Sequence, residues 1–442
     1  MKSRQTHDAQ PVLIVSGLSL RTDTNIGKTL CALFDAYPAD ALAQLYFGPE
    51  LPNVSRCAHY YRVTEQQLIK SGFGLLRSRC GGPVQPVMGV QAGRAANAAP
   101  LVSKKTMIPV RIARDLLWKI SHWKNRQFLS WLDEVQPGVV FAVMPDTIKS
   151  AAAIRFIADR QRIPVVLFVT DDYYNDPQKG KKRLQRWYYR RLQRAIDAAA
   201  ARAVYLFGCS QLAARTFGAH FRLPSQALYT PADPAFTALT RCDQQPGMVC
   251  FRYFGNVGLD RWRILRELGL AIQRYNGKDR RALLEVYSPV TDAQIIRQLE
   301  VENGCTFKGF VSGDTFFQLL AQAQVAVHVE AFGEQMIQRT RLSISTKITD
   351  YLAAGKCILA IGSPEVASMQ HLAEASYQVT DLSELDRAVK TLAEDAQLRL
   401  QLQDKAATAA ERWHRSGGSA AVLKDILDRV EAGEFGHASV SD

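Results

Sequence analysis

The sequence lacks the cysteine patterns and long apolar runs that would place it in a specialised class. Its eight cysteines form no Cys-x-x-Cys pair and no paired spacing, which argues against a zinc site or a disulfide scaffold and favours a reducing compartment. No apolar stretch approaches the roughly 18 residues of a membrane-spanning helix; the longest candidate, 195–208, carries Asp197 and Arg202. A polar start and a short apolar run after Pro11 argue against a secretory signal. We therefore expect a cytoplasmic globular protein.

The chain is long enough for more than one domain. It has 442 residues, of which 47% are hydrophobic and 22% charged, a composition that excludes a disordered chain or a coiled-coil rod. At about 150 residues per domain, the length predicts two or three domains. The net charge of +13 is local, because residues 101–200 alone hold 19 basic and 9 acidic residues.

Two segments of this region combine basic and aromatic residues, and both are predicted to be helical. Segment 177–194 has no acidic residue and interleaves Lys and Arg with Trp187, Tyr188 and Tyr189; segment 111–126 includes Trp118 and Trp123. Such segments can be simply solvated helix faces, or they can bind an anionic membrane surface or a nucleic acid. No DNA- or RNA-binding signature accompanies them, so we do not expect nucleic acid as a partner. Trp and Tyr among Lys and Arg suit a lipid headgroup interface, which keeps peripheral membrane contact open.

Short apolar segments rich in β-branched residues alternate with longer segments of helical periodicity, such as 148–161. Strands that are apolar on both faces are typical of buried parallel sheets. The predicted strands are 12–15, 42–47, 139–144, 165–169 and 204–207 in the first half, and 249–254, 283–287, 306–307, 325–329 and 358–361 in the second. The alternation predicts an α/β protein with two doubly wound, Rossmann-like domains.

Turn-forming residues mark the predicted boundaries. Pro231 and Pro234 in YTPADPAF separate a first domain, 1–235, from a second, 236–385. Residues 386–430 are predicted as C-terminal helices and 431–442 as a disordered tail. The Gly-, Pro- and Ala-rich segment 81–100 is predicted as a long loop within the first domain.

Gly27-Lys28-Thr29 opens a predicted helix after the first strand and superficially matches a nucleoside-triphosphate loop. That loop needs a glycine five residues before Gly27, and the position is occupied by Thr22. We therefore do not expect a nucleoside triphosphatase, although a loop leading into a helix start is still an anion site.

The most informative segment is SISTKITDYLAAGKCILAIGSPE, residues 343–365. Ser345 or Thr346 is predicted to cap a helix, Gly355 to end it, and CILAIG to form the next buried strand. The helix N-terminus would then point at the carboxyl ends of the strands, where open α/β sheets bind ligands. With Lys347 beside the helix dipole, the arrangement predicts an anionic ligand, and a diphosphate fits best.

This segment resembles the donor-binding signature of GT-B glycosyltransferases, in particular the large retaining family four, which reads P-x-K-x-x-E-Y-L-A-x-G-K-P before an apolar strand. The matching residues are Lys347, Asp350, Tyr351, Leu352, Ala353, Gly355 and Lys356. Other landmarks agree in order: VVLFVTDDYY, YLFGCS, YTPADPAF, FRYFGNVGLDRW and FKGFVSGDTFFQLLAQAQVAVHVEAF. The resemblance spans nearly the whole chain and is nearest to bacterial glycosyltransferases of polysaccharides or lipid-linked oligosaccharides.

Two positions depart from the family pattern. The signature glutamate is here Asp350, one methylene shorter, and the glutamate that retaining members carry eight residues earlier is Leu342. Glu330, in EAFG, resembles that first glutamate but has twelve extra residues before Asp350.

The resemblance implies that the nucleotide sugar binds mainly to the second domain and the acceptor to the first. It implies that cations and amides, with no metal or other cofactor, stabilise the leaving diphosphate. The implied donor-binding residues are Asn25, Gly27, Asn256, Gly258, Arg261, Arg263, Thr346 and Lys347. The arginines could equally solvate a helix start.

Four acidic residues are candidates for catalysis. Asp350 and Glu330 are implied by the resemblance, whereas Asp171 and Asp172 end a predicted strand of the first domain. There they could bind an acceptor hydroxyl, act as a base, or simply cap the next turn. His59 and His328 have no partner spacing that suggests a metal and are predicted to be structural.

These observations predict a GT-B glycosyltransferase that moves a sugar from a nucleotide sugar to a saccharide or polyprenyl-linked acceptor in polysaccharide biosynthesis. The family resemblance implies that the transfer proceeds with retention. The basic helices of the first domain would hold it at the inner face of the cell membrane. The alternatives are a sugar-nucleotide epimerase and an inactive GT-B domain that binds sugar or a partner.

Overall fold

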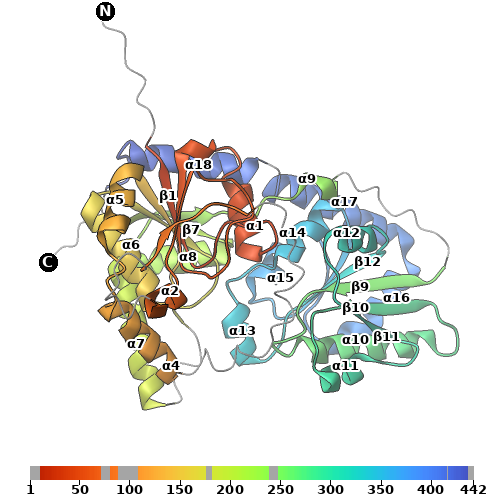
Figure 1. Ribbon diagram of the computed structural model, residues 1–442. Coiled ribbons are helices and arrows are strands. Elements are labelled where there is room, and N and C mark those ends of the chain that lie inside the picture. The colour runs from red at the N-terminus through yellow and green to blue at the C-terminus, as the bar shows by residue number, and fades with distance from the viewer. Residues whose placement is uncertain are drawn as a thin grey trace, which may run out of the picture. The chain divides into compact units, whose positions relative to one another are not determined.

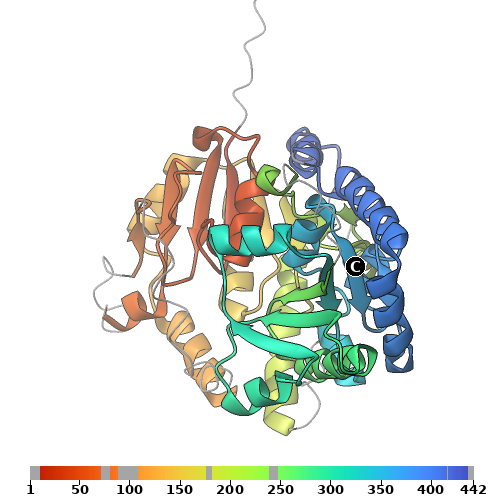
Figure 2. The same ribbon diagram turned by 90° about the vertical axis from the view of Figure 1, so that its right-hand side faces the viewer.

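The computed structural model describes residues 10–70, 80–87, 108–175, 182–237, 247–415 and 417–436, with the side chain of Asn25 left out. The chain divides into two compact units. The first unit comprises Met1–Leu228 and Ala420–Asp442, and the second comprises Tyr229–Ser419. Both units consist of a largely parallel sheet with helices on its faces (Figure 1, Figure 2).

The described part of the first unit contains an eight-stranded sheet in the order β4-β3-β2-β1-β5-β6-β7-β8. Its strands are β1 (Val12–Ser16), β2 (Leu42–Tyr46), β3 (His59–Arg62), β4 (Gly82–Pro83), β5 (Val139–Val143), β6 (Val165–Val169), β7 (Ala203–Gly208) and β8 (Ser225–Ala227). All neighbours pair in parallel except β3 and β4. Every predicted strand of this half is confirmed, and β4, at Gly82–Pro83, falls inside the segment 81–100 that was predicted as a loop; residues 88–100 lie outside the described residues.

Helices cover the sheet of the first unit because their apolar stripes pack on its β-branched and aromatic residues. They are α1 (Asn25–Leu33), η1 (Ala39–Ala41), α2 (Glu65–Lys70), α4 (Ile108–Ile120), α5 (Arg126–Val135), α6 (Ile148–Gln161), α7 (Arg183–Ala200), α8 (Gln211–Phe221) and α18 (Gly418–Glu431). The core joins Ile14, Phe34, Phe141 and Phe168.

The second unit contains a six-stranded parallel sheet in the order β11-β10-β9-β12-β13-β14 among its described residues. The strands are β9 (Val249–Phe254), β10 (Ala282–Tyr287), β11 (Cys305–Gly309), β12 (Val325–Val329), β13 (Cys357–Ile361) and β14 (Tyr377–Val379). The helices are α9 (Pro234–Thr237), α10 (Arg261–Asn276), α11 (Ala293–Leu299), α12 (Gly313–Ala321), α13 (Glu334–Thr340), α14 (Thr346–Ala353), α15 (Ala367–His371), η4 (Leu382–Glu384), α16 (Leu385–Glu394) and α17 (Ala396–Trp413).

Both sheets have a point where the strand order reverses. In the first unit it lies between β1 and β5, and in the second between β9 and β12. The loops after neighbouring strands diverge there, which leaves a crevice at the carboxyl ends of the strands where open α/β sheets bind ligands. Ligand-binding residues are therefore expected near these two points.

The last helix returns to the first unit, which the sequence did not predict. Leu423, Ile426, Leu427 and Val430 of α18 are buried in the first core beside β1 (Figure 1). Helix α17, in contrast, packs on the second unit through Leu402 and Ala406. The helices predicted as one C-terminal group thus divide between the units.

The tail was predicted to be disordered from residue 431, and this is wrong for its first part. Phe435 packs edge-on against Tyr205, with ring centroids 5.0 Å apart, and Glu434 accepts a 2.7 Å hydrogen bond from Arg429. Residues 437–442 lie outside the described residues.

None of the described helices combines the length and apolarity that crossing a membrane requires.

Candidate functional site

The carboxyl edge of the second sheet brings Arg261 and Glu330 together at its reversal point. Glu330 directly follows β12, and Arg261 begins α10, which the loop after β9 introduces. The Arg261 Nη2 donates a 2.8 Å hydrogen bond to Glu330 Oε2, while its Nε donates to the Val329 carbonyl at 3.0 Å. The sequence named both residues, but only the fold shows that they form a pair.

Glu330 is enclosed rather than open to solvent. Its side chain is 3% exposed; Ser368 Oγ donates to Oε1 at 3.3 Å, and His328 Nε2 lies 3.4 Å from the same oxygen. Burial acts to raise the pKa of Glu330, but His328 and the Arg261 guanidinium outweigh it and hold the pKa at about 2. Glu330 is therefore a carboxylate at neutral pH, held among donors.

The loop before α10 is stabilised by its own hydrogen bonds. Asn256 Oδ1 accepts the Gly258 N–H at 2.7 Å, and Tyr253 donates its hydroxyl to the Asn256 carbonyl at 2.8 Å. Leu259 and Asp260 both have positive φ, which is rare for non-glycine residues. The loop thus follows an unusual path that delivers Arg261 to the end of β12.

Arg263 has a different environment from Arg261. Its side chain is 66% exposed, lies 3.4 Å from Asp260, and stacks on the Trp262 ring at 4.8 Å. This matches the solvated helix start that the sequence left open, and the donor role of Arg263 stays a prediction.

Helix α14 forms as its sequence predicts. Ser345 is the N-cap and its hydroxyl accepts the Lys347 N–H at 3.4 Å, while Gly355 adopts a positive φ of 55° after the last turn. Thr346 is the first helical residue. The Lys347 Nζ lies 3.7 Å from the Phe316 ring centroid and 3.3 Å from Asp350 Oδ2. Lys347 is one-third exposed, whereas the Asp350 side chain is 11% exposed.

Helix α14 and the Arg261–Glu330 pair lie at the same edge of the sheet. The N–H of Phe254, the last residue of β9, donates to the Tyr351 hydroxyl of α14 at 3.3 Å. Tyr253, one residue earlier, lies close enough to Arg261 and Glu330 that both of their charges influence the pKa of its hydroxyl. The predicted donor residues of the second unit therefore gather around the end of β9, with Arg263 directed to solvent.

The extra residues between Glu330 and Asp350 form helix α13, Glu334–Thr340. Leu342, which stands where the family pattern has a glutamate, is 1% exposed and belongs to the buried apolar residues. Leu342 therefore supplies packing, whereas most of α13 is exposed and Thr340 is its buried residue.

Asp171 and Asp172 follow β6 at the carboxyl edge of the first sheet, and each holds a neighbour in its own turn. Asp171 Oδ2 accepts from the Tyr173 hydroxyl at 3.1 Å; Asp172 accepts the Asn175 N–H at 2.7 Å and its side-chain amide at 3.2 Å. Turn capping is thus present for Asp172, and the acceptor and base roles of both residues stay predictions.

The loop between β1 and α1 is closely packed. A Cβ on Gly27 would lie 2.4 Å from Thr24 Oγ1 and 2.6 Å from the Arg21 carbonyl, so no larger residue fits. Arg21 ties the loop to the one after β2 through the Leu51 carbonyl at 2.7 Å. Asn25 and Gly27 lie at the start of α1, beside the reversal point of the first sheet. Nothing here assigns them a ligand.

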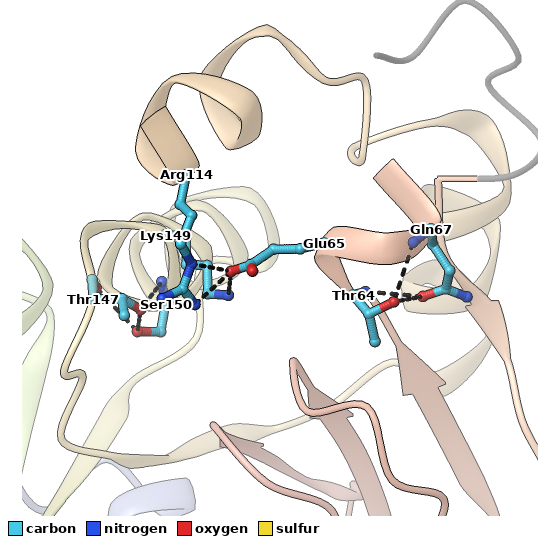
Figure 3. Close-up of polar contacts among 7 residues, drawn as sticks. All are labelled: Thr64, Glu65, Gln67, Arg114, Thr147, Lys149 and Ser150. Carbon is cyan, nitrogen blue, oxygen red and sulfur yellow. Dashed lines mark hydrogen bonds and ion pairs between the residues drawn. The ribbon is translucent and has the colours of Figure 1, made fainter. Parts of the chain in front are cut away.

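A charged cluster that the sequence analysis missed lies at the same edge of the first unit (Figure 3). Glu65 Oε1 accepts from Arg114 Nε at 2.7 Å and from Lys149 Nζ at 3.0 Å, so one oxygen joins α2, α4 and α6. Lys149 is 9% exposed and its ammonium lies 4.6 Å from the Trp118 ring centroid. Burial lowers the pKa of Lys149 against the opposing effect of Glu65. The Thr64–Gln67 capping box, which places Glu65 at the start of α2, is visible in the sequence. The two partners of Glu65 are 49 and 84 residues away along the chain, so the sequence does not reveal them.

The structure corrects the interpretation of the aromatic residues in the basic segments. Trp118, Trp123, Tyr188 and Tyr189 are buried, at 2–7% exposure, and of the aromatic residues in these two segments only Trp187 is exposed, at 46%. The second segment is also not one helix, since α4 ends at Ile120 and α5 begins at Arg126. Residues 177–181 of the first segment lie outside the described residues.

An exposed basic stripe nevertheless runs along α7. It surrounds a hollow of about 290 Å³ and consists of Arg183, Arg186, Trp187, Arg190, Arg191 and Arg194. We call it the α7 arginine stripe. Exposed apolar side chains lie on the same helix and on α4, which contacts α7: Leu184, Val110, Leu116 and Ile120.

Within the described part of the chain, no group of three or more His, Cys, Asp or Glu side chains could hold a metal ion.

Comparisons with solved structures define the class of fold. HepE of Anabaena, solved with UDP and glucose, matches with a TM-score of 0.60 and 14% identity over 95% of this chain and 99% of its own. A sucrose-phosphate synthase of Thermosynechococcus elongatus matches with a TM-score of 0.59 and 12% identity, over 96% and 100%. An α,α-trehalose-phosphate synthase (UDP-forming) of Burkholderia xenovorans, solved with glucose-6-phosphate, gives 0.59 and 12%, over 96% and 100%.

These matches cover both units, and the chain has the GT-B fold, as predicted. No protein-family model matches the sequence, and no curated protein matches it. At 10–15% identity the structural likeness establishes the fold alone.

Proposed function

We propose that the protein is a glycosyltransferase that transfers a sugar from a nucleotide sugar to an acceptor. The observation that carries this proposal is the pair of cations, Arg261 and Lys347, which two different helices place at the carboxyl edge of the second sheet. Each is anchored by a carboxylate, Glu330 or Asp350, and each keeps part of its side chain exposed. A nucleoside diphosphate is the ligand class that such a site fits.

The main catalytic task in this proposal is to stabilise charge on the leaving diphosphate. Preorganised cations do this without reorganising during the reaction, so the proposal needs no metal. In this proposal Asp350 acts near the reacting sugar, and Asn256, Gly258 and Thr346 lie near the nucleotide. Retention of configuration, which the resemblance implies, is part of the proposal.

The solved neighbours suggest the first donor to test. HepE has been solved with UDP and with UDP-glucose, and the trehalose-phosphate synthase is described as UDP-forming. We propose a UDP-hexose as the donor. We propose that the acceptor is a saccharide or is polyprenyl-linked, as in polysaccharide biosynthesis, and that the first unit binds it.

The experiment is a thermal-shift titration of the protein with nucleoside diphosphates and nucleotide sugars, beside Lys347→Ala. We expect saturable stabilisation by one base, about 2.7 kcal/mol at a hundredfold excess over Kd, reduced in the variant. No stabilisation by any nucleotide would contradict the proposal and favour an inactive GT-B domain. Conversion of the donor without any acceptor would instead indicate the epimerase.

We also propose that the protein contacts an anionic membrane at its cytoplasmic face through the α7 arginine stripe. Arg183, Arg186, Arg190 and Arg194 follow each other at spacings of three and four residues, where like charges destabilise a helix by a few tenths of a kcal/mol per pair. An anionic partner would offset this repulsion. The exposed aliphatic side chains Leu116 and Ile120 nearby suit a bilayer and have no use on a nucleic acid.

Co-sedimentation with vesicles tests the membrane contact. We expect binding to vesicles that contain anionic lipid, release at high salt, and loss in Arg190→Glu/Arg194→Glu. The matched control is Lys278→Glu/Arg280→Glu, which reverses two exposed charges of the second unit. Equal retention of the two double variants, or none by the wild type, would refute the contact.

A further inference from the structure

The Arg261 side chain is held along one edge and open along the other. Its Nε donates to the Val329 carbonyl and its Nη2 to Glu330, which accounts for two of the five guanidinium N–H groups. Among the described residues, the structure shows no partner for the other three N–H groups. The side chain is 19% exposed, so it reaches solvent while most of it is enclosed. Held in this way, the guanidinium can offer a planar pair of donors to a phosphate.

Glu330 is held from the opposite side. Oε2 accepts from Arg261 and Oε1 from Ser368, with His328 Nε2 3.4 Å from Oε1. Gly362, in the loop after β13, leaves the room that Glu330 occupies, because a Cβ there would lie 2.9 Å from the Glu330 Cβ. Three consecutive strands of the sheet order, β9, β12 and β13, therefore contribute to placing one carboxylate.

We infer that Glu330 is a positioning residue: it orients Arg261 for a nucleoside diphosphate and does not itself contact the sugar. This inference deepens the proposed function and rests on it. The Glu330 carboxylate is 3% exposed and both of its oxygens accept hydrogen bonds inside the protein, so burial closes it off from a sugar hydroxyl. A guanidinium that is already fixed at its Nε edge loses little rotamer freedom when it binds a diphosphate. The entropy cost of ordering this side chain therefore arises on folding and does not weaken ligand binding.

The test is a double-mutant cycle on ligand affinity. UDP and UMP are titrated calorimetrically into the wild type, Glu330→Gln, Arg261→Met and the double variant. We expect Arg261→Met and Glu330→Gln each to weaken UDP binding roughly ten- to hundred-fold, and UMP binding much less, because the loss concerns the second phosphate. The double variant should bind UDP no more weakly than Arg261→Met alone, since Glu330 acts through Arg261.

A second Glu–Arg pair of the same sheet provides the control. Arg252 Nε donates to Glu285 Oε2 at 2.7 Å, between β9 and β10, and both side chains are nearly buried, at 11% and 13% exposure. Glu285→Gln removes a comparable pair that lies within strands β9 and β10 and not in the loops at their carboxyl ends. It should lower the melting temperature and leave the ratio of UDP to UMP affinity unchanged.

The outcomes separate the inference from the proposed function. If the wild type binds no nucleoside diphosphate, UDP or other, both are refuted. If the wild type binds UDP while Glu330→Gln binds it equally well, or if the two single effects add in the double variant, the positioning role is refuted and the donor site stands. A selective loss in Glu330→Gln that Glu285→Gln does not share would support positioning over a general loss of stability.

Discussion

Burial gives the second lysine of the signature segment, Lys356, a structural role. Lys356 is 1% exposed, and its Nζ donates to the Ala321 carbonyl at 2.6 Å. Ala321 is the last residue of α12, whose final carbonyls carry the negative end of the helix dipole. Lys356, the residue before β13, therefore caps the end of α12. Lys347, nine residues earlier in the same motif, remains partly exposed at the candidate site.

We predict that Lys356→Met lowers the free energy of unfolding by about 1–3 kcal/mol, since the carbonyls of Ala321 and Ala323, at and just after the end of α12, lose this donor. Urea denaturation measures the loss. Lys390→Met, at an exposed position, is the control and should change stability by less than about 0.5 kcal/mol. Under conditions where the variant is fully folded, its nucleotide affinity should equal that of the wild type. An unchanged urea midpoint for Lys356→Met would contradict the capping role.

At the scale of elements, single polar groups join helices that are distant in the sequence. Glu65 connects α2, α4 and α6 through two cations. Lys149, in the first turn of α6, would otherwise be unfavourable beside the positive end of the helix dipole. The carboxylate and the Trp118 ring compensate for that position.

We predict that Glu65→Gln destabilises the protein by about 1–2 kcal/mol, because the neutral amide leaves a nearly buried ammonium without its counter-ion. The value is discounted for the 28% exposure of Glu65. Asp133→Asn removes the exposed Arg160 pair and should cost about 0–1 kcal/mol. Chemical denaturation of the two variants side by side gives the comparison; equal losses would mean that Glu65 is an ordinary surface pair.

A buried histidine pair joins the segment that enters the second unit to the helix that leaves it. His414, after α17, accepts the Ala232 N–H with its carbonyl at 2.8 Å and donates its Nδ1–H to the Thr230 carbonyl at 2.8 Å. Its Nε2 is therefore an acceptor, and His371 Nε2 donates to it at 2.8 Å. Burial lowers the pKa of His371 to about 3 and that of His414 to about 4.

This pair makes stability depend on pH. The folded pKa values lie below the ordinary value of 6.5, so below pH 6.5 the unfolded chain binds protons that the folded chain does not. The free energy of unfolding should therefore fall as pH falls, by up to about 1.4 kcal/mol per pH unit for each histidine. Glu330 adds to the loss only below about pH 4.5, as its carboxylate is protonated towards pH 2.

Denaturation between about pH 5 and 6.5 isolates the histidines. The slope of stability against pH should be smaller for His371→Phe than for the wild type. An unchanged slope would show that these histidines do not titrate on unfolding.

At the scale of the whole molecule, the chain passes twice between the units, after Leu228 and after Ser419. The second passage lets α18 cover the first core with Leu423 and Leu427, each fully buried. The first unit is therefore completed by residues almost two hundred positions beyond its other boundary.

We predict that deleting residues 418–442 lowers the stability of the first unit by several kcal/mol, because four large apolar side chains of α18 leave its core. Differential scanning calorimetry should show the loss, with increased binding of an apolar dye. Deletion of 437–442, which keeps α18 and Phe435, is the control. Matching thermograms for the two truncations would show that α18 contributes no core.

The sequence alone was sufficient to predict the alternation of strands and helices, its restart in a second α/β domain, and the N-cap and C-terminal end of α14. These features depend on local periodicity and on turn residues such as Ser345 and Gly355, whose effects reach only a few residues along the chain. The short edge strands β4, β8 and β14 were missed, because two or three residues carry no period that could be read.

Only the tertiary structure decided which residues meet. Glu330 and Arg261 are 69 positions apart, and Glu65 and Lys149 are 84 apart; such pairs form because parallel strands bring their carboxyl ends to one edge. It also decided that Trp118 and Tyr188 are core residues while Trp187 is exposed, since the face of a helix that is buried depends on what packs against it. The sequence by itself determined the types of element and the chemistry available to them, and the packing of those elements determined which of that chemistry is assembled.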